Sequence, residues 1–259
     1  MDDQPGRVPV DQVGLRYGAA TDVGLLREVN EDSFLARPPV FAVADGMGGH
    51  DGGDIASRMV VDALARLADE GYDPSHGEHA VIAALDAAQQ RLLDYGATHR
   101  GSDGGRWHGG TTAVVALLVE DDHGPAWLLA NLGDSRIYAL AETGLARVST
   151  DHSVVQELVD AGMITEDEAL VHPERHIVTR ALGGPDALDP DFFRIAPVDS
   201  VRVLLCSDGI TGMVADADIE SILTDQDDPR VAAERLVEAA NAAGGVDNST
   251  VIVIDAVQP

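Results

Sequence analysis

The stretch FAVADG at residues 41 to 46 passes directly from apolar side chains to an aspartate and a glycine. Apolar runs also end at an aspartate next to a glycine in LLANLGD at 128 to 134 and in VLLCSDG at 203 to 209. A short apolar run that stops at a carboxylate is typical of a buried strand with an acid at its exit, where the glycine lets the backbone turn. A fourth segment, VDNSTVIVI at 246 to 254, has an aspartate where a strand begins.

These four acids predict a metal site. Carboxylates gathered at one end of a sheet repel each other, so the cluster persists only if cations or protons neutralise it. Taken singly, each acid has a simpler interpretation: Asp134 fits a hairpin turn and Asp247 fits an Asx turn. Their joint occurrence at the ends of buried runs, beside the charged segment REVNED at 27 to 32, favours a divalent metal site built from oxygen ligands.

Length and composition bound the domain organisation. Apolar runs are spread evenly from 34 to 254 without a linker, so we expect one domain over residues 1–259. Residues 1–20 start polar and lack a pattern, which predicts a loose lead-in to the first strand. They also lack the apolar stretch of a signal peptide. No segment has the length needed to span a bilayer, so we expect a soluble protein.

Charge excludes several classes of protein. The net charge is −28, and all 17 basic residues are arginine. Without lysine the chain cannot be a P-loop enzyme, a protein kinase or a Schiff-base enzyme, because each needs an amine at a fixed place. The acidic balance argues against nucleic acid and anionic membranes as partners. The single cysteine, Cys206, lies inside an apolar run, which favours a core residue and a reducing, cytoplasmic compartment.

Between the strand-like runs the spacing is helical. Apolar faces predict helices within 54–71 and 79–96, and Asp228 followed by Pro229 predicts a helix that continues towards residue 245. Together with the strands, these helices predict a mostly antiparallel β core with paired helices outside it.

The segment 152–183 differs from the rest of the chain. It is predicted to form two short helices, the second starting with a capping box of Thr165 and Glu168. It has few large apolar residues and lies between core strands, which is compatible with a mobile flap over a site or with a surface helical hairpin. Periodicity does not separate these two alternatives.

An ordered set of motifs resembles a known family. The chain is similar to the metal-dependent serine/threonine protein phosphatases, the PPM or type 2C family, in its bacterial branch. The resemblance implies an α+β fold, an αββα sandwich of two antiparallel sheets with helix pairs outside, a flap insertion at 152–183 and a metal site at one end. The stretches that carry it are TDVGLLREVNEDSF, VADGMGGHDGGDIAS, GGTTAVVALL, ANLGDSRIY, STDHSVVQELVDAG, HPERHIVTRALGG, LLCSDG and VDNSTVIVI.

The resemblance also implies the metal ligands. Asp45 would bridge two ions, Asp208 and Asp247 would complete the protein ligands of one ion, and the carbonyl of Gly46 would contribute to the other. A third, looser ion would be held by Asp134 and Asp208. An all-oxygen shell favours Mn²⁺ or Mg²⁺ over zinc.

Three further residues receive roles from the same resemblance. Glu31 and Asp32 would orient metal-bound waters, and Arg27 would hold the substrate phosphate by bidentate hydrogen bonds. Two ions about 3.5 to 4 Å apart would lower the pKa of a bridging water, so that hydroxide attacks phosphorus in line without a covalent phosphoenzyme.

Two positions depart from the family pattern. Met47 stands where eukaryotic members have a histidine that is a proposed general acid, as is usual in bacterial members, and His50 is the nearest histidine downstream. Gly212 stands in SDGITGM where bacterial members tend to have a polar residue. The first departure concerns the acid that protonates the leaving group, and the second concerns support for the third ion.

The predicted function is a cytoplasmic, monomeric, Mn²⁺- or Mg²⁺-dependent phosphatase in signalling that acts on phosphoserine and phosphothreonine in substrates of serine/threonine kinases. One alternative is a catalytically silent phosphoprotein-binding regulatory domain on the same fold. The set Arg27, Asp45, Asp208 and Asp247 argues against it, because a silent domain has no need of a repulsive acid cluster. A second alternative is a hydrolase of small phosphate esters.

Overall fold

The chain is described by a computed structural model over residues 10–48, 52–101, 104–105, 107–122, 124–196 and 198–257. Two antiparallel five-stranded sheets dominate it. The strands of the first sheet, in spatial order, are β1 (Gly14–Asp22), β12 (Ser249–Val257), β11 (Arg202–Cys206), β8 (Arg136–Ala141) and β9 (Gly144–Arg147). Those of the second are β10 (Asp191–Ile195), β7 (Gly124–Leu132), β6 (Ala113–Asp121), β3 (Val40–Ala44) and β2 (Ser33–Arg37).

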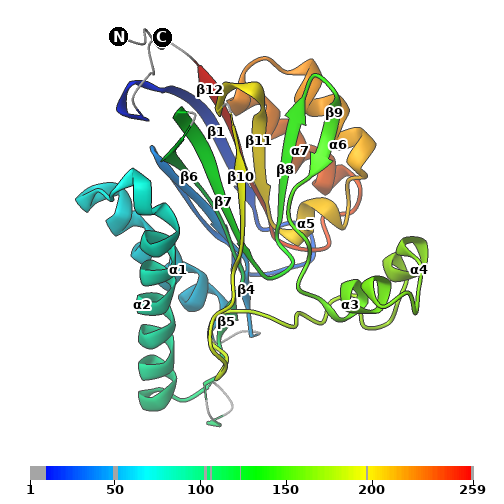
Figure 1. Cartoon of the computed structure of the whole chain (residues 1–259). Coiled ribbons are helices and arrows are strands. Elements are labelled where there is room, and N and C mark those ends of the chain that lie inside the picture. Colours follow the sequence, from blue (N-terminus) through cyan, green and yellow to red (C-terminus); the bar gives the residue numbers. More distant parts are fainter. Residues whose placement is uncertain are drawn as a thin grey trace, which may run out of the picture.

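Helices cover the outer faces of the two sheets (Figure 1). A short ribbon of β4 (Gly46–Met47) and β5 (Gly110–Thr111) continues from one end of the second sheet. The α-helices are α1 (Gly53–Glu70), α2 (Gly77–Thr98), α3 (Val154–Asp160), α4 (Glu166–Leu170), α5 (Asp208–Thr211), α6 (Asp216–Asp225) and α7 (Pro229–Ala242). Single 3₁₀ turns are η1 (Val10–Gln12), η2 (Pro74–His76) and η3 (Val198–Ser200).

The apolar runs form strands that are buried on both faces. In β3, Phe41 and Val43 point into the layer between the sheets, whereas Val40, Ala42 and Ala44 pack beneath α1 and α2. Successive side chains of a strand point to opposite faces, so a strand covered on both sides must be apolar throughout. The order helix, sheet, sheet, helix confirms the predicted αββα sandwich.

The helical predictions are confirmed. Asp228 caps α7 by accepting a hydrogen bond from the backbone of Arg230, and Pro229 is its first residue. The capping box of Thr165 and Glu168 is present at the start of α4. Cys206 is a buried member of the core under α7, where burial raises the pKa of its thiol to about 12. Among the described residues, no helix combines the length and apolar character needed to cross a membrane.

The prediction of a loose lead-in over residues 1–20 is wrong from Gly14 onward. Residues 14–22 form β1 and pair with β12 along their whole length. Helix α7 passes so close to this strand that a Cβ atom on Gly18 would lie 2.1 Å from Cα of Arg230. The strand therefore has glycine or alanine at 18 to 20, which hides the alternation that a strand under larger side chains shows.

The segment 152–183 projects from the end of the sandwich where β4 and β5 lie (Figure 1). Its two ends join where Ser153 bridges Val178, and the backbone N–H of Val154 donates to the carbonyl of Ile177 over 2.9 Å. Helices α3 and α4 contain no buried residue. They stand beside the sandwich as a helical pair; that this flap moves remains a prediction.

Candidate metal centre

The Asp45 backbone is fixed where β3 ends. Its N–H donates to Oγ1 of Thr112 over 3.0 Å, while its carbonyl accepts from the Thr112 N–H at 3.0 Å and from the Thr111 hydroxyl at 2.9 Å. Oγ1 of Thr112 also lies 2.7 Å from the hydroxyl of Ser135, the residue after Asp134. Two threonines thus position the acid at the end of β3 and connect it to the turn that carries Asp134.

Gly46 is where three segments meet. A Cβ atom at this position would lie 2.2 Å from the carbonyl oxygen of Gly53 and 2.5 Å from that of Glu31. Any side chain at Gly46 would therefore force the start of α1 away from the loop before β2. The absence of a side chain brings Glu31 to the first turn of α1, where Oε1 would lie 2.8 Å from a Cβ added to Gly53.

Asp208 and Asp32 come together beyond the end of β11. Asp208 is the first residue of α5, so its carboxylate lies at the amino end of a helical turn. Ser207, just before it, donates its hydroxyl proton to Oδ2 of Asp32 over 2.8 Å and accepts the N–H of Thr250 at 3.0 Å. The other carboxylate oxygen of Asp32, Oδ1, is buried and has no hydrogen-bond partner among the residues that the structure describes.

Asp247 stands before β12 and pairs with Arg27. Nη2 of Arg27 donates to Oδ2 of Asp247 over 2.7 Å, and the Asn248 N–H donates to Oδ1 over 2.9 Å. The Asn248 side chain holds the loop around Arg27 on both sides. Its amide donates to the carbonyls of Val23 and Val29 at 2.9 and 3.0 Å, and its Oδ1 accepts from the N–H of Glu31 at 2.8 Å.

The electrostatics confirm that these acids are neighbours. Burial raises the pKa of Asp32 to about 7, with Thr250 and Ser207 opposing that rise and Asp208 and Asp247 adding to it. Burial also raises the pKa of Asp134 to about 7, assisted by Asp208. Each residue retains some solvent access, although protein surrounds its carboxyl group.

The pKa values of Asp45 and Asp208 depend on each other. Burial and the charges of Asp32, Asp208 and Asp134 raise the pKa of Asp45 well above its ordinary value. Burial and the charge of Asp247 raise the pKa of Asp208, while its hydrogen bond with Asp45 and the charge of His176 lower it. The interaction between the two carboxyl groups raises the pKa of Asp45 and lowers that of Asp208.

The side chains fit a divalent cation with oxygen ligands. Carboxylates that bind protons to relieve their mutual repulsion bind cations for the same reason. In addition, Oδ1 of Asp32 has no hydrogen-bond donor among the described residues. Over the described residues, no three ligand side chains already surround one point. One contribution to this is the ion pair that engages Asp247 with Arg27.

The sequence pattern did not single out the residues that support the acids. Thr112, Ser207 and Asn248 each hold the backbone or carboxylate of a predicted site residue. Their positions next to the aspartate motifs are the available signal, but Ser, Thr and Asn are equally common in ordinary turns. The sequence assigned no role to His176, yet its charge acts on Asp208.

The two departures from the family pattern have different outcomes. Met47 lies in β4, opposite Gly110 of β5, and is partly buried. His50, the nearest histidine downstream of Met47, lies outside the described residues. Gly212 ends α5 by donating its N–H to the carbonyl of Asp208 over 2.7 Å, and it supplies no polar side chain for a third ion.

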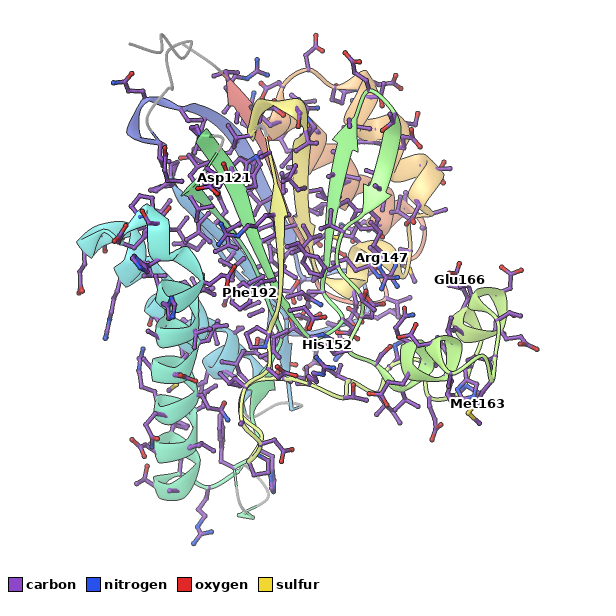
Figure 2. The ribbon with its side chains drawn as sticks, viewed as in Figure 1. Asp121, Arg147, His152, Met163, Glu166 and Phe192 are labelled. Carbon is purple, nitrogen blue, oxygen red and sulfur yellow. The ribbon has the colours of Figure 1, made fainter. Side chains whose placement is uncertain are left out.

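The base of the flap is tied to the turn that carries Asp134. The N–H of Gly133 donates to Nδ1 of His152 at 3.1 Å, and the N–H of His152 donates to the carbonyl of Gly133 at 2.9 Å. Nε2 of His152 lies 3.2 Å from Oδ2 of Asp191, and the carbonyl of His152 accepts from Thr179 at 2.8 Å. Figure 2 shows His152 where the flap joins the sandwich, with Met163 and Glu166 at the outer end.

Comparison with known proteins gives a consistent result. The family model for protein phosphatase 2C matches residues 27–241. The serine/threonine protein phosphatase PstP of Mycobacterium tuberculosis is 40% identical over 245 residues, which cover 94% of this chain but 45% of that protein. The chain thus spans about half the length of PstP. The serine/threonine phosphatase Stp of Listeria innocua is 33% identical over 243 residues, which cover 91% of this chain and 93% of that one.

Solved structures agree with the sequence comparison. The crystal structure of the catalytic domain of PstP in complex with two manganese ions superposes with a TM-score of 0.82 at 37% identity, covering 95% of this chain and 99% of that chain. The PPM serine/threonine phosphatase MsPP of Mycobacterium smegmatis, in complex with cacodylate, superposes with a TM-score of 0.80 at 37% identity and covers 92% and 97%.

Proposed function

Because the chain belongs to the protein phosphatase 2C family, we propose that it is a metal-dependent phosphatase that hydrolyses phosphoserine and phosphothreonine in proteins. The observation that carries the proposal is the convergence of Asp45, Asp134 and Asp208 at one end of the sandwich, with raised pKa values that stem first from burial and then from one another. Such a cluster costs stability unless a cation offsets it.

The proposed ligands are those that the sequence predicted. Asp45 would contact both principal ions, Asp208 and Asp247 would hold one of them, and the carbonyl of Gly46 would face the other. Mn²⁺ or Mg²⁺ bound there supplies an activated water nucleophile and offsets charge on the phosphoryl oxygens. Asp134, whose carboxyl interacts with that of Asp208, is the proposed additional ligand for a third ion.

Arg27 is the proposed phosphate anchor. Its side chain is 49% exposed and reaches the acid cluster through Asp247. Partial burial acts to lower the pKa of Arg27, but the charge and hydrogen bond of Asp247 raise it overall, so the guanidinium stays charged. A planar guanidinium can leave its carboxylate partner and hold two phosphoryl oxygens by parallel hydrogen bonds.

Glu31 and Asp32 have the proposed task of orienting water around the ions. Their positions differ, since Glu31 lies at the first turn of α1 and Asp32 lies against Ser207. Oδ1 of Asp32 is available to accept a hydrogen bond from a water in this cluster. Both residues would therefore act on metal-bound water and would not bind the metal themselves.

The proposed substrates are phosphoproteins produced by serine/threonine kinases in a signalling process. A net charge of −28 disfavours nucleic acid and acidic membranes as partners. We propose a monomer in the cytoplasm, the latter from the single buried thiol.

A metal-dependence assay tests the proposal. The protein is stripped with chelator, titrated with Mn²⁺, Mg²⁺ or Zn²⁺, and assayed on a phosphothreonine peptide and on nitrophenyl phosphate. We expect no turnover without metal and restoration by Mn²⁺ or Mg²⁺. Binding of the phosphopeptide without turnover at saturating Mn²⁺ would support the silent regulatory domain, and turnover of nitrophenyl phosphate alone would support a small-ester hydrolase.

A further inference from the structure

Four large apolar side chains are exposed around the proposed phosphate anchor. Leu25 and Leu26 are 67% and 68% exposed, Val29 is 53% exposed and Val246 is 47% exposed. Leu26 directly precedes Arg27 in the chain, and Val246 directly precedes Asp247, its ion-pair partner. We call these four residues the apolar rim. Leu25 lies against the segment that carries Val246, since a Cβ atom added to Gly245 would lie 2.8 Å from Cγ of Leu25. Exposed apolar residues grouped next to a charged site are typical of a surface that receives a partner.

The backbone beneath the rim is well held. The N–H of Leu25 donates to the carbonyl of Gly245 over 2.7 Å, which joins the two segments that carry the rim. Asn248 binds the carbonyls of Val23 and Val29, at the two ends of the loop. The apolar side chains are therefore presented at fixed places, so an incoming partner would find the surface already formed.

The position of the rim suggests what it receives. Arg27 lies within the same loop as three of its members, so a phosphate bound by Arg27 would be next to the rim. An extended peptide advances about 3.3 Å per residue, so side chains one to three residues from a phosphorylated residue would reach roughly 3 to 10 Å along the surface. Over this range, such side chains would meet the residues that adjoin Arg27 in the chain.

Resting on the proposed function, we propose that the apolar rim docks apolar side chains that lie within three residues of the phosphorylated residue of a protein substrate. A second copy of the chain is the competing occupant. Its net charge of −28 opposes self-association, since two such chains repel each other. Continuity with the phosphate anchor therefore favours substrate over a second copy.

The test compares two phosphothreonine peptides. One carries leucine or valine at the three positions on each side of the phosphothreonine, and the other carries serine there. The measured quantity is the ratio of their kcat/KM values at saturating Mn²⁺, because a general loss of activity cancels in that ratio. We expect wild type to prefer the apolar peptide about tenfold, as removal of roughly 55 Å² of apolar surface from water would give.

Two double variants locate the preference. Leu26→Ser with Val29→Ser removes half of the rim, and Ile82→Ser with Leu93→Ser removes two exposed apolar residues from α2, where exposure is 39% and 37%. We expect the preference to fall below about threefold in the rim variant, through a higher KM for the apolar peptide, and to stay about tenfold in the α2 variant. Thermal unfolding and Mn²⁺ titration of both variants establish that fold and metal binding are retained.

Several results would overturn the proposal. Equal kcat/KM for the two peptides in wild type, or a preference that survives in the rim variant, would show that the rim receives no substrate side chain. Dimers that light scattering detects in wild type, and that the rim variant loses without a change in preference, would identify a self-association surface. Turnover of nitrophenyl phosphate with no turnover of either peptide would instead refute the proposed function, and the rim proposal with it.

Discussion

The acid centre and the flap lie at the same end of the sandwich, yet they are stabilised in different ways. The acids follow strands of both sheets, and residues far away in the chain hold their backbones, as Thr112 does for Asp45 and Asn248 does for Glu31. The flap buries no residue of α3 or α4 and joins the sandwich at its two ends, where His152 hydrogen-bonds with Gly133 and Leu182 pairs with Thr111. The comparison teaches that the repulsive cluster needs the rigid frame, while the outer part of the flap can vary without disturbing it.

The two regions meet at few points. His152 joins the base of the flap to the turn before Asp134, and the charge of His176 acts on Asp208. Both contacts involve the two ends of the flap, whereas Met163 and Glu166 lie at its outer end (Figure 2). Breaking the acid centre should therefore abolish chemistry, and shortening the flap should affect only large substrates.

The largest expected effect is that of Asp45→Asn. An amide keeps the shape of the side chain and removes the charge that offsets two cations. Loss of a residue that only orients a metal ligand costs up to about 100-fold. Loss of the ligand charge itself should therefore lower Mn²⁺ affinity and kcat each by more than about 100-fold. Calorimetric Mn²⁺ titration and phosphopeptide turnover measure the two. Asp86→Asn, an exposed acid on α2, is the matched control. Activity within tenfold of wild type at saturating Mn²⁺ would refute the assignment of Asp45.

Arg27→Ala should separate metal binding from phosphate binding. Loss of the guanidinium should lower kcat/KM by roughly 2 to 4 kcal/mol of transition-state binding. Mn²⁺ affinity should hold or rise, because Arg27 occupies Oδ2 of Asp247 in the described state. The control is Arg235→Ala, an exposed arginine on α7 that pairs with Glu238. A drop in Mn²⁺ affinity would count against a role confined to phosphate.

Shortening the flap should give a smaller and more selective effect. Residues 154–177 are replaced by three glycines, since Ser153 and Val178, the residues to be joined, already form a β-bridge. We expect kcat/KM on a phosphopeptide to fall about tenfold, or ~1.4 kcal/mol, and turnover of nitrophenyl phosphate to change much less. Equal losses on both substrates would mean that the flap supports the acid centre itself.

The last prediction concerns the pH dependence of stability without metal. The folded pKa of Asp32, about 7, exceeds its ordinary value of 3.8, so the folded state binds a proton more tightly than the unfolded state. That contribution to stability is complete below pH 3.8 and is lost as pH rises through 7. Asp32→Asn does not titrate.

In chelator, we therefore expect the melting temperature of Asp32→Asn minus that of wild type to increase as the pH rises from 4 to 8. Each kcal/mol of stability that wild type loses should add about 2 to 4 °C to this difference. Saturating Mn²⁺ should reduce the gain, because cations offset the same charge. Asp86→Asn again serves as control. A gain that shrinks towards pH 8 would show that Asp32 is ionised in the folded protein without cost.

Much of the fold could be predicted because its strands are covered on both faces. An apolar run such as 203–206, bounded by turn residues, is typical of a strand buried on both faces, and the helices between such runs have regular apolar faces. Strand β1 escaped prediction because α7 approaches Gly18 too closely for large side chains. The rule that identified the inner strands does not apply to a strand that needs small residues.

The sequence by itself determined which acids would meet, because an aspartate that follows a buried run must appear at the end of a sheet. Only the tertiary structure decided how they meet: the interaction between the carboxyl groups of Asp45 and Asp208, the ion pair of Arg27 with Asp247, and the hydrogen bonds of Asn248 to the loop around Arg27. The physical reason is that each of these contacts joins residues distant in the chain through atoms a few ångströms apart. A linear pattern identifies the side chain that reaches a sheet end, whereas its partner there depends on how the two sheets pack.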